Sequence, residues 1–117
     1  MANEVYWIHK LKLNPGVTEA EFEKYAKEEL NWSSAWPKVS GCKEIRVLKA
    51  VDLPWRPDKS GEFDYLSISV WDKEEHRKFI EGDGFSTPEV QAFMGQIKQS
   101  SMFEFVGGLG SVEPVNL

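Results

Sequence analysis

FDYLSISVWDKEEHRKFI, residues 63–80, changes its hydrophobic period halfway along. Up to Asp72 the side chains alternate between two faces, which is typical of a β-strand. From Asp72 onward the apolar residues recur with a helical period, and Asp72 itself is a suitable N-cap. One strand face carries Leu66, Ile68 and Val70, the other carries Tyr65, Ser67, Ser69 and Trp71, and the helical stripe is His76, Phe79 and Ile80. We therefore expect a strand with both faces covered that turns directly into an amphipathic helix.

The segment before this strand predicts a strand and a helix. Residues 5–13 alternate, and the turn that follows leads to Thr18, which opens a helix with a capping box. A single helix over 18–36 is expected, because the residue before Pro37 is disfavoured in the α region. At 100° per residue, Glu29 projects into the middle of the apolar arc of this helix. The sequence therefore places a carboxylate on the side of the helix that faces the core.

A second strand and a long loop precede the central strand. Residues 42–51 alternate weakly and carry several charges, which favours an edge position in the sheet. Residues 52–62 read as a loop with a turn at 60–61, and the role of its Leu53–Gly61 part does not follow from the sequence.

The last third of the chain predicts another helix and a final strand. A helix is expected to begin at Ser86, with Pro88 in its first turn. Residues 102–106 read as a strand that ends before the glycine-rich stretch 107–110. The resulting order β-α-β-β-α-β is that of the ferredoxin-like α+β fold, an antiparallel four-stranded sheet with its helices on one face.

The apolar side of the central strand predicts a partner. A sheet with helices on one face leaves Leu66, Ile68 and Val70 too apolar to remain in water, and the sequence holds no third layer to cover them. We expect residues 1–117 to form one domain that pairs sheet to sheet with a second copy, giving a homodimeric α+β barrel.

Composition narrows the function classes. The chain has a net charge of −5 and no basic stretch, so nucleic acid and anionic membranes are not expected partners. Its one cysteine, Cys42, cannot form an intrachain disulfide, and no segment reads as a signal peptide or membrane span. A cytoplasmic protein is the resulting expectation.

Aromatic residues make up 13% of the chain, and in so small a domain aromatics beyond the need of the core often line a ligand cleft or a subunit interface. Among them and beside them lie polar side chains that the predicted register turns toward the same space. An apolar cavity with a few convergent polar groups is the usual form of a small-molecule site. The candidate catalytic residues are His9, Glu29 and His76, and the candidate substrate-binding residues are Trp7, Trp36, Tyr65, Ser69, Trp71 and Phe79. The two histidines and the carboxylate could also form a metal site, but nothing in their spacing requires one, so no metal and no cofactor are predicted.

Three motifs carry a resemblance to a known superfamily: LKLNPGVTEAEF (residues 11–22), ISVWDKEEHRKFI (68–80) and FSTPEVQAF (85–93). In these the chain resembles the dimeric α+β barrel superfamily. That group includes antibiotic-biosynthesis and haem-degrading monooxygenases, EthD-like proteins and REDY-like proteins. The resemblance implies a homodimer with a ligand cleft between sheet and helices in each subunit.

The chain departs from the site residues of this superfamily at two positions. In the haem-degrading branch an asparagine on the first strand, a tryptophan at the strand-to-helix junction and a helical histidine build the site. His9 falls at the asparagine position and Trp71 matches the tryptophan, but the helical histidine has no counterpart in the turn after Phe85. The glutamate that often stands two residues before the tryptophan is replaced by Ser69. These departures argue against haem degradation and against any one reaction of the group.

Two function classes fit the sequence. The first is a cofactor-free enzyme of the oxygenase, isomerase or cyclase type, acting on an apolar, aromatic or polyketide-like substrate with His9 as base. The second is a non-catalytic dimer that binds an apolar ligand or has a structural role, in which the polar groups are only hydrogen-bond partners.

Overall fold

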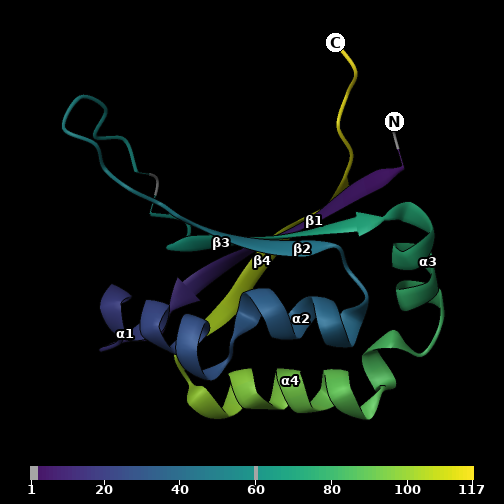
Figure 1. Cartoon of the computed structure of the whole chain (residues 1–117). Helices are drawn as coiled ribbons and strands as arrows, with labels where there is room; N and C mark the ends of the chain where they lie inside the picture. The colour runs from purple at the N-terminus through teal and green to yellow at the C-terminus, as the bar shows by residue number, and fades with distance from the viewer. Residues whose placement is uncertain (1–2, 60) are drawn as a thin grey trace.

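The computed structural model describes residues 3–59 and 61–117. Its four strands form one antiparallel sheet in the order β2-β3-β1-β4, and the helices cover a single face of that sheet (Figure 1). The elements are β1 (Glu4–Leu13), α1 (Glu19–Lys24), the π-helical segment η1 (Tyr25–Glu29), α2 (Trp32–Ser40), β2 (Glu44–Lys49), β3 (Tyr65–Asp72), α3 (Lys73–Glu81), the 3₁₀ turn η2 (Gly84–Ser86), α4 (Pro88–Ser100) and β4 (Phe103–Val112). The predicted ferredoxin-like α+β fold, with β2 at an edge, is confirmed.

The central strand β3 has the two faces that its alternation predicts. The side chains on its helix-facing side are buried, and Trp71 is completely so. On the opposite side Leu66 and Ile68 are half-buried and Val70 is buried, although none of the described helices lies on that face of the sheet (Figure 1). Asp72 ends the strand and caps α3, because its carboxylate accepts a 3.0 Å hydrogen bond from the backbone amide of Glu74. The strand-to-helix turn is therefore fixed by the residue that the sequence indicated.

The helix predicted over 18–36 is wrong, because the chain forms two helices there. Thr18 and Glu21 do form the expected capping box. After α1, however, the amide of Leu30 donates to the carbonyl of Tyr25, an i→i+5 bond of 2.9 Å that inserts a π-helical turn. Asn31 then takes the left-handed conformation at φ 51° and ψ 49°, and α2 starts at the next residue.

Pro37 does not end the helix as predicted, but lies inside α2. Because α2 begins only at Trp32, the proline falls in its second turn. The carbonyl that loses a helical partner belongs to Ser33, which is exposed.

The predicted end of the final strand is also wrong, since β4 continues through the glycines to Val112. These glycines pair with β1, and the register shifts twice, between Ile8 and His9 and again between Lys10 and Leu11. Gly107 and Gly110 have positive φ values of 155° and 75°, which side-chain-bearing residues rarely adopt. The glycines therefore absorb two irregularities without ending the strand.

Two helix details differ from the prediction. Ile80 is 45% exposed rather than buried, so only Phe79 of the apolar stripe of α3 is fully packed. Helix α4 is capped by Thr87 instead of Ser86, and the Thr87 hydroxyl accepts from the amide of Val90. Pro88 occupies the first turn as expected.

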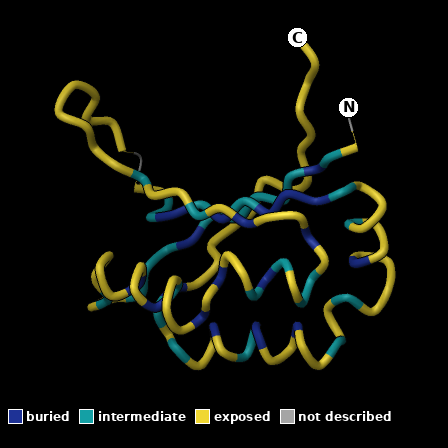
Figure 2. The backbone as a smooth tube through the Cα atoms, in the orientation of Figure 1, coloured by how far each residue is buried: buried dark blue, intermediate teal, exposed yellow. Residues whose placement is uncertain are grey.

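The loop between β2 and β3 rises away from the body on the side of the sheet that has no helices (Figure 1). Figure 2 shows it as exposed along most of its length. Leu53 and Arg56 pair across a tight turn that leaves Trp55 79% exposed. The turn predicted at 60–61 includes Ser60, which lies outside the described residues.

The core lies between the sheet and the helical layer, where the buried positions of α2 and α4 face inward (Figure 2). The most deeply buried large side chains are Leu11, Phe22, Trp71 and Val90. No helix within residues 3–59 and 61–117 is both long and apolar enough to cross a membrane.

Candidate functional site

A cavity of about 310 Å³ lies between the sheet and helices α2 and α4. Its walls are almost entirely apolar, and the helical wall comes from the buried stripes of those two helices. The lining residues are Trp7, His9, Trp32, Trp36, Ile45, Ser67, Ser69, Phe85, Phe93, Met94, Ile97 and Phe105. This size and composition are those of a small-molecule site.

The polar part of the lining is confined to the two central strands. His9 of β1 lies directly opposite Ser67 of β3, and Trp7 lies opposite Ser69. Among the described residues, no hydrogen-bond partner is found for the His9 imidazole or for either serine hydroxyl, although both serines are buried. These three groups therefore form the polar floor of the cavity, on its sheet side, and each can donate a hydrogen bond to a ligand or accept one from it.

His9 is half-buried and held mainly by aromatic contacts. Its ring lies 4.9 Å from the ring of Trp7 and 5.6 Å from that of Phe105, centroid to centroid, in edge-to-face geometry. On β4 it faces Gly108, where a Cβ atom would approach the His9 ring carbon Cδ2 to 3.3 Å. Burial lowers the pKa of His9 below its ordinary value of 6.5. Burial therefore favours the neutral imidazole, which is the form able to accept a proton.

His9 and Trp71 lie on the same face of the sheet, as the predicted register requires. Trp71 pairs with Val5 and His9 with Ser67 in the unbroken β1–β3 ladder, so an even number of residues separates the two pairs. Trp71 is nevertheless not part of the cavity lining. It packs behind Trp7, with a centroid distance of 6.2 Å, in an aromatic cluster with Phe79.

The same cluster contains His76, whose ring lies 5.2 Å from that of Trp71 and 5.5 Å from that of Trp7. Burial lowers the pKa of His76. Trp71 Nε1 and His76 Nε2 are buried, and neither has a hydrogen-bond partner among the described residues. Sequence reasoning placed both residues on the correct side of the sheet, and Trp7 connects them to the cavity wall.

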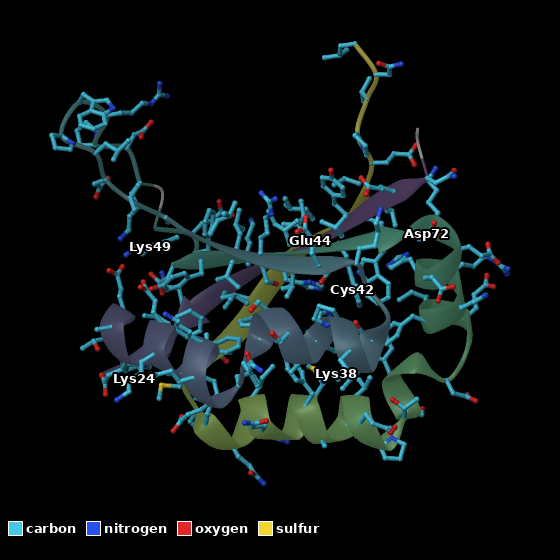
Figure 3. The ribbon with its side chains drawn as sticks, in the orientation of Figure 1. Lys24, Lys38, Cys42, Glu44, Lys49 and Asp72 are labelled. Carbon is cyan, nitrogen blue, oxygen red and sulfur yellow. The ribbon has the colours of Figure 1, made fainter. Side chains whose placement is uncertain are left out.

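Tyr65 lies outside this cavity, in a groove of about 380 Å³ at the other end of the helical layer. Its hydroxyl donates a 2.7 Å hydrogen bond to the carboxylate of Glu23, which also pairs with Lys49 at 3.2 Å. In Figure 3 the Lys49 side chain extends from the end of β2 toward the carboxylates of α1. Burial and the neighbouring carboxylate raise the pKa of Tyr65, while the tyrosine hydrogen bond lowers the pKa of Glu23.

The predicted inward orientation of Glu29 is wrong. Its side chain is exposed, and the structure uses its backbone carbonyl instead, which accepts a 3.2 Å hydrogen bond from the side chain of Gln96. The π-helical turn at 25–29 is the reason, because it adds a residue to the helix and rotates this position toward water. Within the described residues no three His, Cys, Asp or Glu side chains gather in a way that could hold a metal ion.

Several lining residues were missed by sequence reasoning. Phe93, Met94 and Ile97 belong to the apolar stripe of α4, which the helical period indicates only as core. Trp32, by contrast, falls within the apolar arc of the helix predicted over 18–36, so the sequence does place it on the buried side, although the structure begins a new helix there. Phe105 lies in the strand predicted over 102–106, on the same face as Phe103, but the sequence does not indicate that this face lines a cavity. Four of the predicted residues, Trp7, His9, Trp36 and Ser69, do line the cavity.

The fold and the position of the cavity define a ferredoxin-like α+β protein with room for a small molecule between its sheet and helices. No protein-family model matches the sequence, and no curated protein matches it. Among solved structures the chain is similar to HapK from Hahella chejuensis, with a TM-score of 0.62 and 16% identity over 97% of this chain and 94% of that one.

Two further structures share this fold. One is an EthD family protein from Bacillus halodurans, with a TM-score of 0.55 and 14% identity over 98% of this chain and all of that one. The other is a dimeric ferredoxin-like protein of unknown function from Thermobifida fusca, with a TM-score of 0.51 and 15% identity over 97% of this chain and 91% of that one. At these identities the similarity establishes the fold alone, which is the predicted ferredoxin-like α+β fold.

Proposed function

We propose that this chain is a cofactor-free enzyme of the oxygenase, isomerase or cyclase type, acting on an apolar or aromatic, polyketide-like substrate. The observation that carries the proposal is the cavity of about 310 Å³, which is apolar except for His9, Ser67 and Ser69 on its floor. An aromatic ligand would pack against the tryptophan and phenylalanine walls. Its hydroxyl or carbonyl group would then point toward the central strands.

The chemical step assigned to His9 is proton transfer. The neutral imidazole accepts the proton of a ligand hydroxyl or activated C–H group and becomes imidazolium, leaving the electron pair on the ligand. In an isomerase or cyclase the proton returns after rearrangement, and in an oxygenase the electron-rich ligand anion reacts with dioxygen as second substrate. Burial favours this role, because it lowers the pKa of His9 and so favours the unprotonated form of the base.

The proposal includes a homodimer that pairs through the uncovered face of the sheet. Three apolar side chains are neighbours on that face. Leu48 of β2 pairs with Leu66 of β3, and Ile68 lies two residues further along β3. Leu48 is 48% exposed. None of the described helices lies on that face of the sheet (Figure 1). The similar protein from Thermobifida fusca is itself described as dimeric. A second copy buries such a face most simply, because its own apolar face is the matching surface.

Binding of 2-naphthol and of 2-methylnaphthalene tests the proposed site. The two probes have similar shape and differ in the hydroxyl group, so their affinity ratio reports on the polar floor. We expect 2-naphthol to bind more tightly and to move the NMR signals of the His9 ring, including its titration midpoint. His9→Gln should remove most of this preference and leave binding of the methyl probe unchanged.

Two results would contradict the proposal. If neither probe binds, or if bound 2-naphthol leaves the His9 signals in place, the cavity is not the ligand site. If His9→Gln changes neither affinity nor the conversion of phenolic candidate substrates, His9 has no catalytic role and the chain is a binding protein.

A further inference from the structure

The cavity and the groove near Tyr65 share a wall. Trp32 of α2 and Ile45 of β2 are the two residues that line both hollows. They are 5% and 8% exposed, so both side chains are buried. One of the two comes from the helical layer and the other from the sheet, so both layers contribute to the boundary between the hollows.

Trp32 owes its position to the break in the first helical region. The left-handed Asn31 ends the π-helical segment, and Trp32 is the first residue of α2. Its indole stacks on Phe103 of β4, with ring centroids 5.6 Å apart and an angle of 18° between the planes. This contact with the sheet fixes the large ring between the two hollows.

We propose that Trp32 and Ile45 determine specificity by limiting the length of the ligand that the cavity accepts. The inference rests on the proposed function and deepens it by naming the substrate class, a compact aromatic molecule of two or three fused rings. The two hollows together have more than twice the volume of the first one. Without the wall they would form a continuous channel that runs along the sheet and accepts an elongated ligand.

The groove differs from the cavity in chemistry, which gives the opened channel a recognisable preference. Its floor is apolar, with Phe22 and Val47, but its far side carries the Tyr65 hydroxyl, the Glu23 carboxylate and the Lys49 ammonium group. An elongated ligand with a hydroxyl at its distal end could therefore hydrogen-bond there. The native wall prevents a ligand seated on His9 from reaching these groups.

The test compares two probes that share a head group. The compact probe is 2-naphthol, and the elongated probe is 6-(4-hydroxymethylphenyl)-2-naphthol, which extends the same ring system in line and ends in a neutral hydroxyl. Affinities for the wild-type protein and each variant are measured by fluorescence titration. The measured quantity is the ratio of the two affinities, so a general loss of stability or binding cancels.

Two wall variants and two matched controls are needed. Ile45→Ala and Trp32→Leu open the wall from the sheet side and from the helix side. Ile97→Ala and Trp36→Leu remove the same atoms from residues that line the cavity but not the groove. The controls therefore enlarge the first hollow alone. If Trp32→Leu does not fold, Ile45→Ala still tests the proposal, since it opens the same wall with a smaller change.

We expect the wild-type protein to prefer the compact probe at least tenfold, and the wall variants to lose or reverse this preference. The two control variants should keep it. The inference is overturned if the wild-type protein binds both probes equally, or if wall and control variants give the same ratio. A wild-type protein that binds neither probe would overturn the proposed function itself, and the inference with it.

Discussion

Replacing Ile68 with lysine should convert the proposed dimer into monomers. Ile68 lies in the middle of the uncovered sheet face, between Ile8 of β1 and Arg46 of β2. It is half-buried in the single chain, so a lysine there can extend its ammonium group into water while the subunit is alone. In a sheet-to-sheet dimer that group would be buried, and its neighbour Arg46 carries the same charge.

The expected effect is large because symmetry doubles it. An uncompensated buried charge costs roughly 3–5 kcal/mol, and a twofold interface contains the substitution twice. The total of roughly 6–10 kcal/mol corresponds to a dissociation constant weakened by about 10⁴- to 10⁷-fold. A dimer with nanomolar affinity would therefore be monomeric at micromolar concentration.

Light scattering at micromolar concentration measures the result directly. The wild-type protein should have about twice the 13.4 kDa mass of the chain, and Ile68→Lys should have the monomer mass or unfold, which circular dichroism reports. Ile68→Val keeps the apolar face and should remain dimeric. A wild-type protein that is a stable folded monomer, or an Ile68→Lys variant that remains dimeric, would refute the reasoning.

Three further predictions concern the site and its surroundings. If the protein is an active enzyme, His9→Gln should lower its turnover by about 10²-fold or more. Wild-type activity should rise with pH through a midpoint below 6.5, because burial lowers the pKa of His9. A flat pH profile would contradict the assignment of His9 as the base. Tyr65→Phe should destabilise the fold by about 1 kcal/mol and reduce the loss of stability on acidification. The reason is that the Tyr65 hydrogen bond lowers the pKa of Glu23 in the folded state. The contribution of Glu23 to stability is therefore present above the ordinary carboxyl pKa and is lost as pH falls through the folded-state value. Urea titrations between pH 3 and 7 measure this loss in both proteins. Gly108→Ala should displace the His9 ring, since its Cβ would lie 3.3 Å from Cδ2, and unchanged His9 NMR signals would refute that contact.

The sequence predicted the part of the site that depends on strand register. The period of two in β1 and β3 places His9, Ser69 and Trp71 on the helix-facing side, and the unbroken β1–β3 ladder leaves that placement intact. The strand-to-helix turn at Asp72 was predictable for a similar reason. Its signal is a local cap that no distant contact overrides.

The parts that failed depend on departures from regular geometry. A projection at 100° per residue cannot anticipate the i→i+5 bond at Leu30, and one extra residue in the turn is enough to bring Glu29 into water. The glycines of β4 carry no alternating side chains, so the period that identifies a strand disappears although the pairing with β1 continues. Trp32 lies in the apolar arc of the predicted helix and stacks on Phe103 of the predicted strand, but its position between two hollows has no signal in the sequence.

The glycine-rich strand β4 makes the two edges of the sheet unequal. The β2 edge carries Glu44, Arg46 and Lys49, and charged side chains of this kind discourage a foreign strand from pairing. From Phe105 to Val112 the β4 edge has no charge at all, and Phe105, Val106, Leu109 and Val112 are each at least 39% exposed. Unpaired backbone groups beside exposed apolar side chains are a template for strand addition. We therefore expect any aggregation of the chain to proceed through β4, and the useful place for a solubilising lysine is that strand.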